Sequence, residues 1–189
     1  MTLAEELVAA LRAKGQTVAF CESLTAGLAS ATLADVPGAS AVLRGGLVTY
    51  ATDLKGRLAG VPEKVLEEHG PVSEETAAAM ALGAHDRCGA DWAVALTGVA
   101  GPDPQDGHPV GEVWLGLAGP GIGDSRGGGG ATVRTLRAES PGSMRSASSP
   151  REPDPVPVID GDRRTIRAAA VDAAFRALLT GVRAQEETR

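Results

Sequence analysis

The stretch TVAFCESLTAGLASATLAD, residues 17–35, decides the fold of this chain. Residues 17–21 are mostly apolar and predict a short buried strand, while the alanine-rich residues 28–35 predict a helix. The polar loop 22–27 joins the two. In α/β proteins such a loop lies at the carboxyl end of a strand, where ligands usually bind. Ser23 is therefore placed at a strand-to-helix junction suited to a functional site.

Strands and helices alternate over most of the chain on both sides of this stretch. Apolar residues at helical spacing, with a glycine after the last turn, predict the first helix. The remaining elements are indicated by β-forming runs, by proline or acidic residues at helix starts and by glycine after helix ends. The pattern predicts helices at 3–14, 62–69, 73–87 and 162–182, a short helix carrying Lys55, and strands at 47–52, 92–97 and 113–118. We expect an α/β fold, a three-layer α/β/α sandwich around a mostly parallel or mixed sheet.

Residues 119–160 interrupt this alternation with a segment rich in glycine, proline and serine. Such a composition buries little apolar surface and predicts a flexible insertion within a single domain that spans residues 1–189. Two short pieces inside it resemble strands. Residues 131–138 alternate as an edge strand does, and the prolines around residues 156–159 would restrict a second strand there to an edge.

The composition limits the classes of partner. The chain has 189 residues, of which 43% are hydrophobic, enough for one sizeable core. Its net charge of −6 argues against nucleic acid, whose phosphates are bound mainly by lysine and arginine. No run approaches the roughly 20 apolar residues of a membrane span, and no basic and apolar leader opens the sequence. We expect a cytoplasmic protein without a membrane partner, and self-association into a homo-oligomer only by analogy with similar enzymes.

The two cysteines and three histidines are far apart in the sequence and match no metal-ligand spacing. We therefore expect no metal and no other cofactor. This leaves hydroxyl and amine side chains as the groups that could carry chemistry.

Ser23 and Thr25 have two interpretations, since either could act on a ligand or simply cap the following helix. A serine nucleophile needs a base, and no Ser-His-Asp or Gly-x-Ser-x-Gly pattern surrounds any serine here. Lysine remains as a base, and only Lys55 follows a strand that looks buried, where desolvation would lower its pKa. The alternative is an ordinary solvated helix lysine. Residues 98–103 could likewise let the backbone approach a ligand or form a plain turn.

Several sequence blocks resemble a known family. ESLTAG at 22–27, RGGLVTY at 44–50 followed by Lys55, GPVS at 70–73, LTGVAGPD at 96–103, PVG at 109–111 and GDR at 161–163 are similar, in order, to blocks of the CinA C-terminal domain family. This family includes the PncC-type nicotinamide-nucleotide amidohydrolases, or NMN deamidases. The resemblance covers residues 3–118 and resumes over 161–179.

The resemblance implies a metal-free amidohydrolase of pyridine nucleotide salvage that converts nicotinamide mononucleotide (NMN) to nicotinic acid mononucleotide and ammonia. By this resemblance Ser23 is the nucleophile, Lys55 its general base and Tyr50 a neighbour that tunes or relays the proton. The remaining assignments concern substrate binding. They place Thr25 and the backbone of Ala26 and Gly27 at the developing oxyanion, and Arg44, Arg163, Thr97, Gly98 and Gly101 around the nucleotide, with the two arginines and the glycine loop near its phosphate.

Two positions depart from the family pattern. Ala51 stands where members commonly have serine, and Cys21 where a small residue such as alanine is usual. Neither change removes a proposed catalytic group, but Ala51 could delete a hydrogen bond to the substrate or to Tyr50. Ala51 therefore keeps an alternative open, a catalytically silent nucleotide-binding or competence-associated interaction protein.

Overall fold

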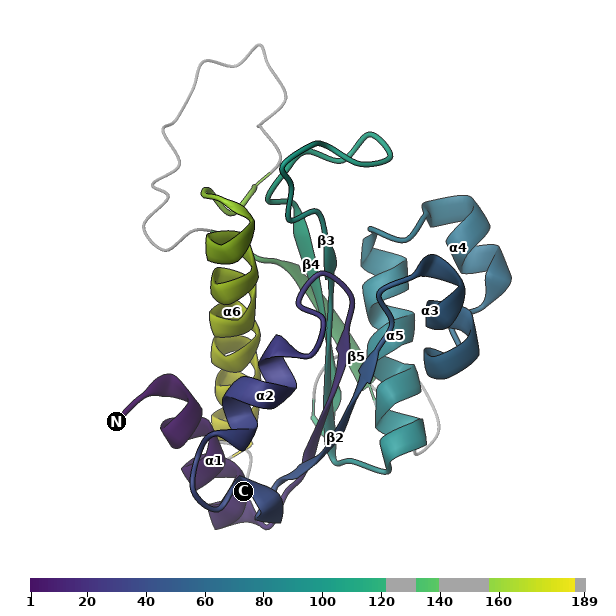
Figure 1. Cartoon of the computed structure of the whole chain (residues 1–189). Helices are drawn as coiled ribbons and strands as arrows, with labels where there is room; N and C mark the ends of the chain where they lie inside the picture. The colour runs from purple at the N-terminus through teal and green to yellow at the C-terminus, as the bar shows by residue number, and fades with distance from the viewer. Residues whose placement is uncertain (122–131, 140–156, 186–189) are drawn as a thin grey trace, which may run out of the picture.

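A five-stranded mixed sheet forms the centre of the computed structural model, which describes residues 1–121, 132–139 and 157–185 (Figure 1). Its strand order is β2-β1-β3-β4-β5. β1 pairs in parallel with β2 and β3, whereas β4 and β5 are antiparallel. The strands are β1 (Val18–Glu22), β2 (Leu43–Val48), β3 (Trp92–Gly98), β4 (Val113–Gly119) and β5 (Thr132–Arg137). The expected α/β class with a mixed sheet is confirmed.

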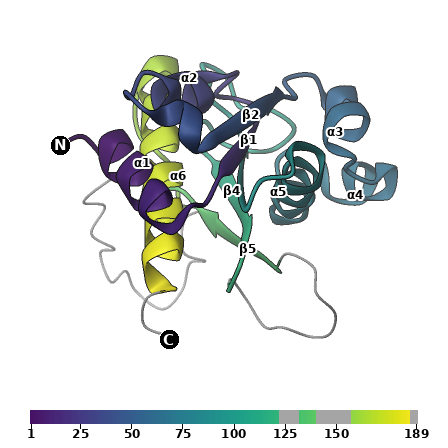
Figure 2. The same ribbon diagram turned by 90° about the horizontal axis from the view of Figure 1, so that it is seen from below.

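Helices cover both faces of the sheet, which confirms the three-layer sandwich (Figures 1 and 2). One layer holds α1 (Leu3–Lys14), α2 (Leu28–Ala34) and α6 (Arg163–Ala184), and a short 3-10 turn, η1 (Ala39–Ala41), precedes β2. The other layer holds α3 (Thr52–Ala59), α4 (Glu63–His69) and α5 (Glu74–Cys88). None of the helices in the described part of the chain has the length and apolarity needed to cross a membrane.

The two sides of the sheet pack differently. The side under α1, α2 and α6 buries large residues such as Phe20, Trp92 and Phe175. The side under α5 buries mainly alanines, so the helices there lie close to the sheet and to one another. A Cβ on Gly83 of α5 would overlap the carbonyl oxygen of Ala59, at the end of α3. This close approach fixes α3 against α5.

Two expectations change in the structure. The strand expected at 47–52 begins and ends earlier, because β2 pairs in register with β1 from Leu43 beside Val18 to Val48 beside Glu22, and the chain then leaves the sheet towards α3. The edge strand expected at 131–138 is confirmed as β5. Residues 157–160 form no strand. Most of the expected flexible insertion, residues 122–131 and 140–156, and with it Val156, lies outside the described residues.

Candidate active site

Ser23 and Lys55 meet at the carboxyl end of the sheet. Ser23 directly follows β1, and its N–H donates to Leu96 O at 2.9 Å, which continues the pairing with β3. Lys55 lies on α3, which follows the neighbouring strand β2. Its Nζ donates to Ser23 Oγ at 2.9 Å and to Thr49 O at 3.1 Å. The order of the strands therefore brings together the two side chains that the sequence suggested.

The surroundings of Lys55 favour its neutral form. Its side chain is only 1% exposed, and it forms no ion pair with a carboxylate among residues 1–121, 132–139 and 157–185. Burial lowers the pKa of Lys55 from the usual 10.5, since desolvation disfavours the ammonium. The buried Cys21 thiol interacts electrostatically with Lys55, and burial raises the pKa of this thiol to about 11. The pair is thus a buried amine with a lowered pKa in contact with a hydroxyl.

The loop that carries Ser23 is anchored by Glu22, a residue the sequence analysis did not single out. The Glu22 carboxylate is fully buried and accepts hydrogen bonds of 2.7–3.0 Å from the N–H groups of Gly27, Ala29 and Ser30 and from the Ser30 hydroxyl. Ser30 and Ala29 belong to the first turn of α2, so the carboxylate also complements the helix dipole. Glu22 therefore acts as the cap of α2, the role considered for Ser23 and Thr25.

These bonds change two expected roles. The N–H of Gly27 is taken by Glu22, and the N–H of Ala26 donates to Ser23 O at 3.1 Å. Neither group is free to act as the oxyanion donor that the sequence suggested. Thr25 differs, because its buried Oγ1 has no hydrogen-bond partner in the described part of the chain. Such an unpaired buried hydroxyl is uncommon. Thr25 is, however, fully buried and does not line the cavity described below.

A cavity of about 140 Å³ opens beside the pair. Its walls come from the ends of β1 and β3, the start of α3, the turn before α5 and the start of α6. It is lined by Ser23, Leu24, Tyr50, Thr52, Lys55, Pro71, Val72, Thr97, Gly98, Val99, Ala100, Gly101, Asp103, Gln105 and Arg163. Five of the expected substrate residues or neighbours thus lie here, namely Tyr50, Thr97, Gly98, Gly101 and Arg163. The sequence analysis did not single out Thr52 and Gln105, and it noted Pro71, Val72 and Asp103 only as members of family blocks, without a role in the site.

Arg163 bridges the mouth of this cavity. It donates to Gly101 O at 2.7 Å and to the hydroxyl of Tyr50 at 2.6 Å. The Tyr50 ring is 54% exposed, and its hydroxyl is bound to Arg163 rather than to Ser23 or Lys55. Tyr50 therefore lies at the entrance of the cavity, and its hydroxyl makes no hydrogen bond in the described structure to the Ser23–Lys55 pair, for which the family resemblance implied a proton relay.

Arg44 does not reach the cavity. It follows Leu43 at the start of β2, beside Val18 at the start of β1, so it lies at the opposite end of the sheet from Ser23. Its Nε donates to Cys88 O at 3.1 Å. Arg44 therefore lies away from this cavity, at the amino-terminal end of β2, and the geometry gives no support to its expected role in holding phosphate.

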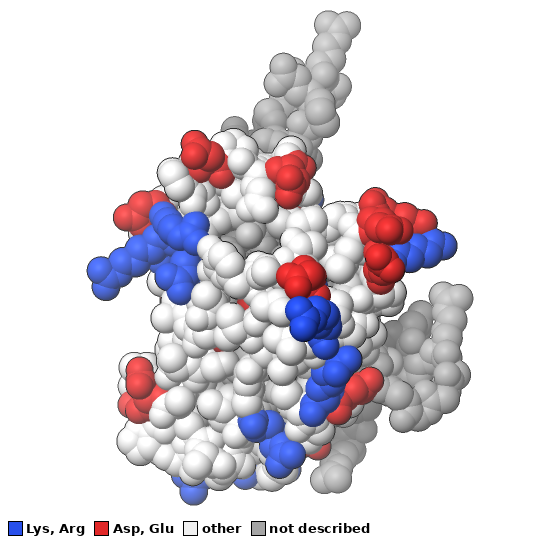
Figure 3. Space-filling view, turned by 45° about the vertical axis from the view of Figure 1, so that its right-hand side comes forward, with Lys and Arg blue, Asp and Glu red and all other residues white. Residues whose placement is uncertain are grey.

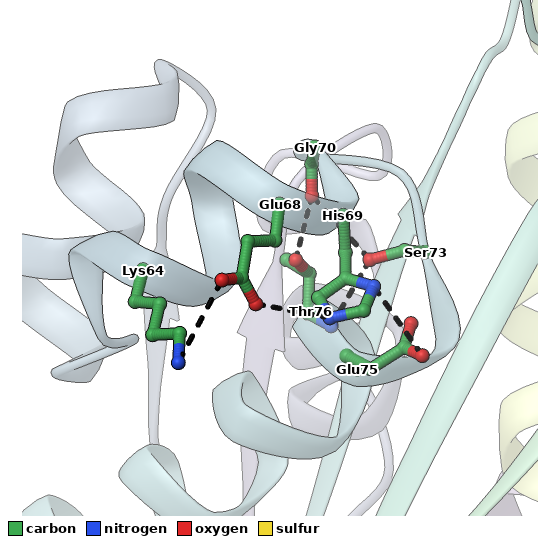
Figure 4. Close-up of polar contacts among 7 residues, drawn as sticks. All are labelled: Lys64, Glu68, His69, Gly70, Ser73, Glu75 and Thr76. Atoms are coloured by element: carbon green, nitrogen blue, oxygen red, sulfur yellow. Dashed lines mark hydrogen bonds and ion pairs between the residues drawn. The ribbon is translucent and has the colours of Figure 1, made fainter.

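The turn before α5 supplies one wall and is held by a local network (Figure 4). Thr76 Oγ1 donates to Gly70 O at 2.7 Å, Ser73 caps α5, and His69 lies 3.5 Å from Glu75. Inside the molecule, Thr97 Oγ1 donates to Pro71 O at 2.6 Å. The strand end that carries Thr97 is thereby tied to this turn.

Basic side chains gather beside the cavity. A second hollow is lined by Leu28, Asp162, Arg163, Arg164, Arg167 and Ala168. Figure 3 shows such a basic cluster over the amino-terminal end of α6, at the upper left. Asp162 caps this helix by accepting from the N–H of Thr165 at 2.8 Å.

Among the residues that the structure describes, no group of three or more histidine, cysteine or acidic side chains is placed to hold a metal ion.

Comparisons with known proteins all give matches to the same protein family. Residues 1–127 match the CinA C-terminal domain family. A competence-damage inducible protein of Limosilactobacillus fermentum is 51% identical over 118 residues, and one of Streptococcus pneumoniae is 51% identical over 117 residues. Each alignment covers 62% of this chain, and the chain spans only 28% of the length of these curated relatives.

Solved structures match over nearly the whole chain. The competence/damage inducible protein CihA from Agrobacterium tumefaciens superposes with a TM-score of 0.76 at 31% identity, covering 94% of this chain and 92% of that one. A CinA superfamily protein from Klebsiella pneumoniae gives a TM-score of 0.76 at 29% identity, with 95% of both chains covered.

Proposed function

Because this chain belongs to the CinA C-terminal domain family, we propose that it is an amidohydrolase that converts NMN to nicotinic acid mononucleotide and ammonia in pyridine nucleotide salvage. One observation carries the proposal. A buried amine, with its pKa lowered by desolvation, lies 2.9 Å from the hydroxyl of Ser23 at the floor of a cavity. This is the arrangement that a serine nucleophile with a lysine base requires.

The proposed reaction has two halves. Neutral Lys55 takes the proton of Ser23 as Oγ attacks the carboxamide carbon, and the resulting ammonium then protonates the departing nitrogen, which leaves as ammonia. An ester on Ser23 remains. Water attacks this ester while Lys55 again accepts a proton, and the acid product leaves as Ser23 regains its hydrogen. The electron-withdrawing pyridinium ring of NMN makes its carboxamide more susceptible to this attack than an ordinary amide.

The cavity suits the other parts of such a substrate. The exposed ring of Tyr50 would face the cationic ring of the nucleotide, since aromatic faces attract cations. Arg163 would bind the phosphate, because its guanidinium matches phosphate oxygens. The wall formed by Thr97, Gly98 and Gly101 would lie along the nucleotide.

The test is ammonia release from the purified protein incubated with NMN, with and without a chelator. Ser23→Ala and Lys55→Met should each abolish turnover, and the chelator should have no effect. Lys64→Met is a matched control, since Lys64 lies on the surface helix α4 and pairs with Glu68 at 3.7 Å. Retained activity in Ser23→Ala would overturn the nucleophile assignment.

A second candidate is a catalytically silent nucleotide-binding or competence-associated protein, which the names of the matched relatives favour. The same preparation distinguishes the two. Binding of NMN in calorimetry, with no ammonia released by the wild type, would support the silent protein.

A further inference from the structure

Arg167 of α6 reaches across to the loop that carries Ser23. Its Nε donates to Leu24 O at 3.0 Å and its Nη2 donates to Thr25 O at 2.7 Å. The two acceptors are consecutive carbonyls that directly follow Ser23. They are more than 140 residues away in the sequence, so only the fold creates this contact.

The loop is therefore held from two directions by charges of opposite sign. Glu22 binds donors on the far side of the loop, the N–H groups of Gly27, Ala29 and Ser30. Arg167 binds acceptors next to Ser23. Charged partners make stronger hydrogen bonds than neutral ones, and the planar guanidinium fixes two acceptors at once. Between the two anchors the backbone has little freedom.

This arrangement also determines where one N–H points. A peptide group is planar and trans, so its N–H points opposite to its carbonyl. Because Leu24 O faces Arg167, the N–H of Thr25 is directed away from α6. That N–H has no acceptor among the described residues. The positive guanidinium also polarises the peptide group and strengthens this N–H as a donor.

We propose that Arg167 is a positioning residue, which acts through the Leu24 and Thr25 carbonyls to hold Ser23 in line with Lys55 and to orient the adjacent N–H. The inference rests on the proposed amidohydrolase function. In this inference Arg167 does not contact the substrate. Its role thus differs from that of Arg163, whose hydrogen bonds lie at the cavity mouth.

The test compares variants of the full chain. Arg167→Met keeps an unbranched, mostly apolar side chain and loses both hydrogen bonds, and a displacement of about 1 Å at a reacting group can lower the rate about 100-fold. We expect kcat to fall by about 10- to 100-fold with KM little changed, and Arg167→Lys to recover part of the loss. The pH dependence should keep its midpoint, because the contact of Lys55 with Ser23 remains.

Arg164→Met is the matched control. Arg164 lies about one turn earlier on α6 and lines the same hollow, yet makes no hydrogen bond to the loop in the described structure. Its loss removes the same charge and should leave kcat unchanged. Thermal unfolding of all variants checks that the fold is retained. An equal fall of kcat in Arg164→Met would overturn the inference, since charge alone would then explain the effect.

A second readout separates this inference from the proposed function. A sulfonyl fluoride reacts with an activated serine, which displaces fluoride while Lys55 takes the proton, and mass spectrometry gives the labelling rate of Ser23. If Ser23 of the wild type is labelled but no ammonia is released from NMN, the proposed substrate is rejected. Slower labelling of Ser23 in Arg167→Met would in that case still support the positioning role of Arg167. Equal labelling and equal kcat in wild type and Arg167→Met, or no labelling of the wild type at all, would overturn it.

Discussion

The floor and the mouth of the cavity are built in different ways. At the floor Lys55 is 1% exposed and Ser23 8% exposed, and buried partners from neighbouring strand ends hold both. At the mouth the Tyr50 ring is 54% exposed, and a single guanidinium, that of Arg163, joins it to Gly101. The floor is thus fixed by the core of the protein, and the mouth by one side chain at the surface.

This difference separates chemistry from recognition. Electrostatic interactions are strong where water is excluded and weak where solvent and salt screen them. A change at the floor should therefore act mainly on kcat, whereas a change at the mouth should act mainly on KM. The following predictions test this division.

The largest effect is expected for Lys55→Arg. Arginine keeps a positive charge in proteins and cannot accept the proton of Ser23. We expect kcat to fall by about 1,000-fold or more, as when a member of a catalytic unit is removed. Ammonia release under saturating NMN measures it, with Lys64→Arg as the control on exposed α4. A fall of less than about tenfold would mean that Lys55 is not the base.

The pH dependence should follow Lys55. Burial lowers the pKa of this amine from 10.5, and the protonated form is inactive as a base, so kcat/KM should rise about tenfold per pH unit below the shifted pKa. A plateau should follow before pH 10.5. Arg163→Met should keep the midpoint. A midpoint at the pKa of a free lysine would contradict the prediction.

The same shift has a consequence for stability. The unfolded chain binds this proton more tightly than the folded one. The contribution of Lys55 therefore makes the fold less stable as the pH falls from 10.5 through its folded-state pKa.

A smaller effect is expected at the mouth. Arg163→Met should raise KM for NMN by about 10- to 100-fold with little change in kcat, since a hydrogen bond to a charged group contributes about 1.5–3 kcal/mol. Nicotinamide riboside lacks the phosphate and serves as the control substrate, for which wild type and variant should differ little. An equal loss on both substrates would show that Arg163 does not bind phosphate.

Part of the floor could be predicted from the sequence, since Ser23 and Lys55 were each expected to follow a strand. That the two side chains meet depends on β1 and β2 being parallel neighbours, which the sequence did not show. Arg167 could not be predicted, since its contact depends on how α6 is rotated over the loop. Arg44 was assigned to the phosphate through the family resemblance, whereas the structure places it at the amino-terminal end of β2, away from Ser23.

The smallest effect concerns Ala51, the departure from the family pattern. It is the N-cap residue of α3 and makes no side-chain cap bond. Ala51→Ser should therefore stabilise the fold by about 0.5–1 kcal/mol and leave ammonia release unchanged. Chemical denaturation measures the gain, and Ala51→Val, which cannot cap, should show none. A change in KM would instead indicate that position 51 touches the substrate.

The glycine at position 83 matters to anyone who engineers this protein. Replacing a helical glycine by alanine is a standard way to make a protein more heat-resistant. Here the added methyl group would collide with the end of α3 and push away the helix that carries Lys55. A substitution chosen to raise thermal stability, at a residue that does not line the cavity, would therefore displace Lys55 from Ser23.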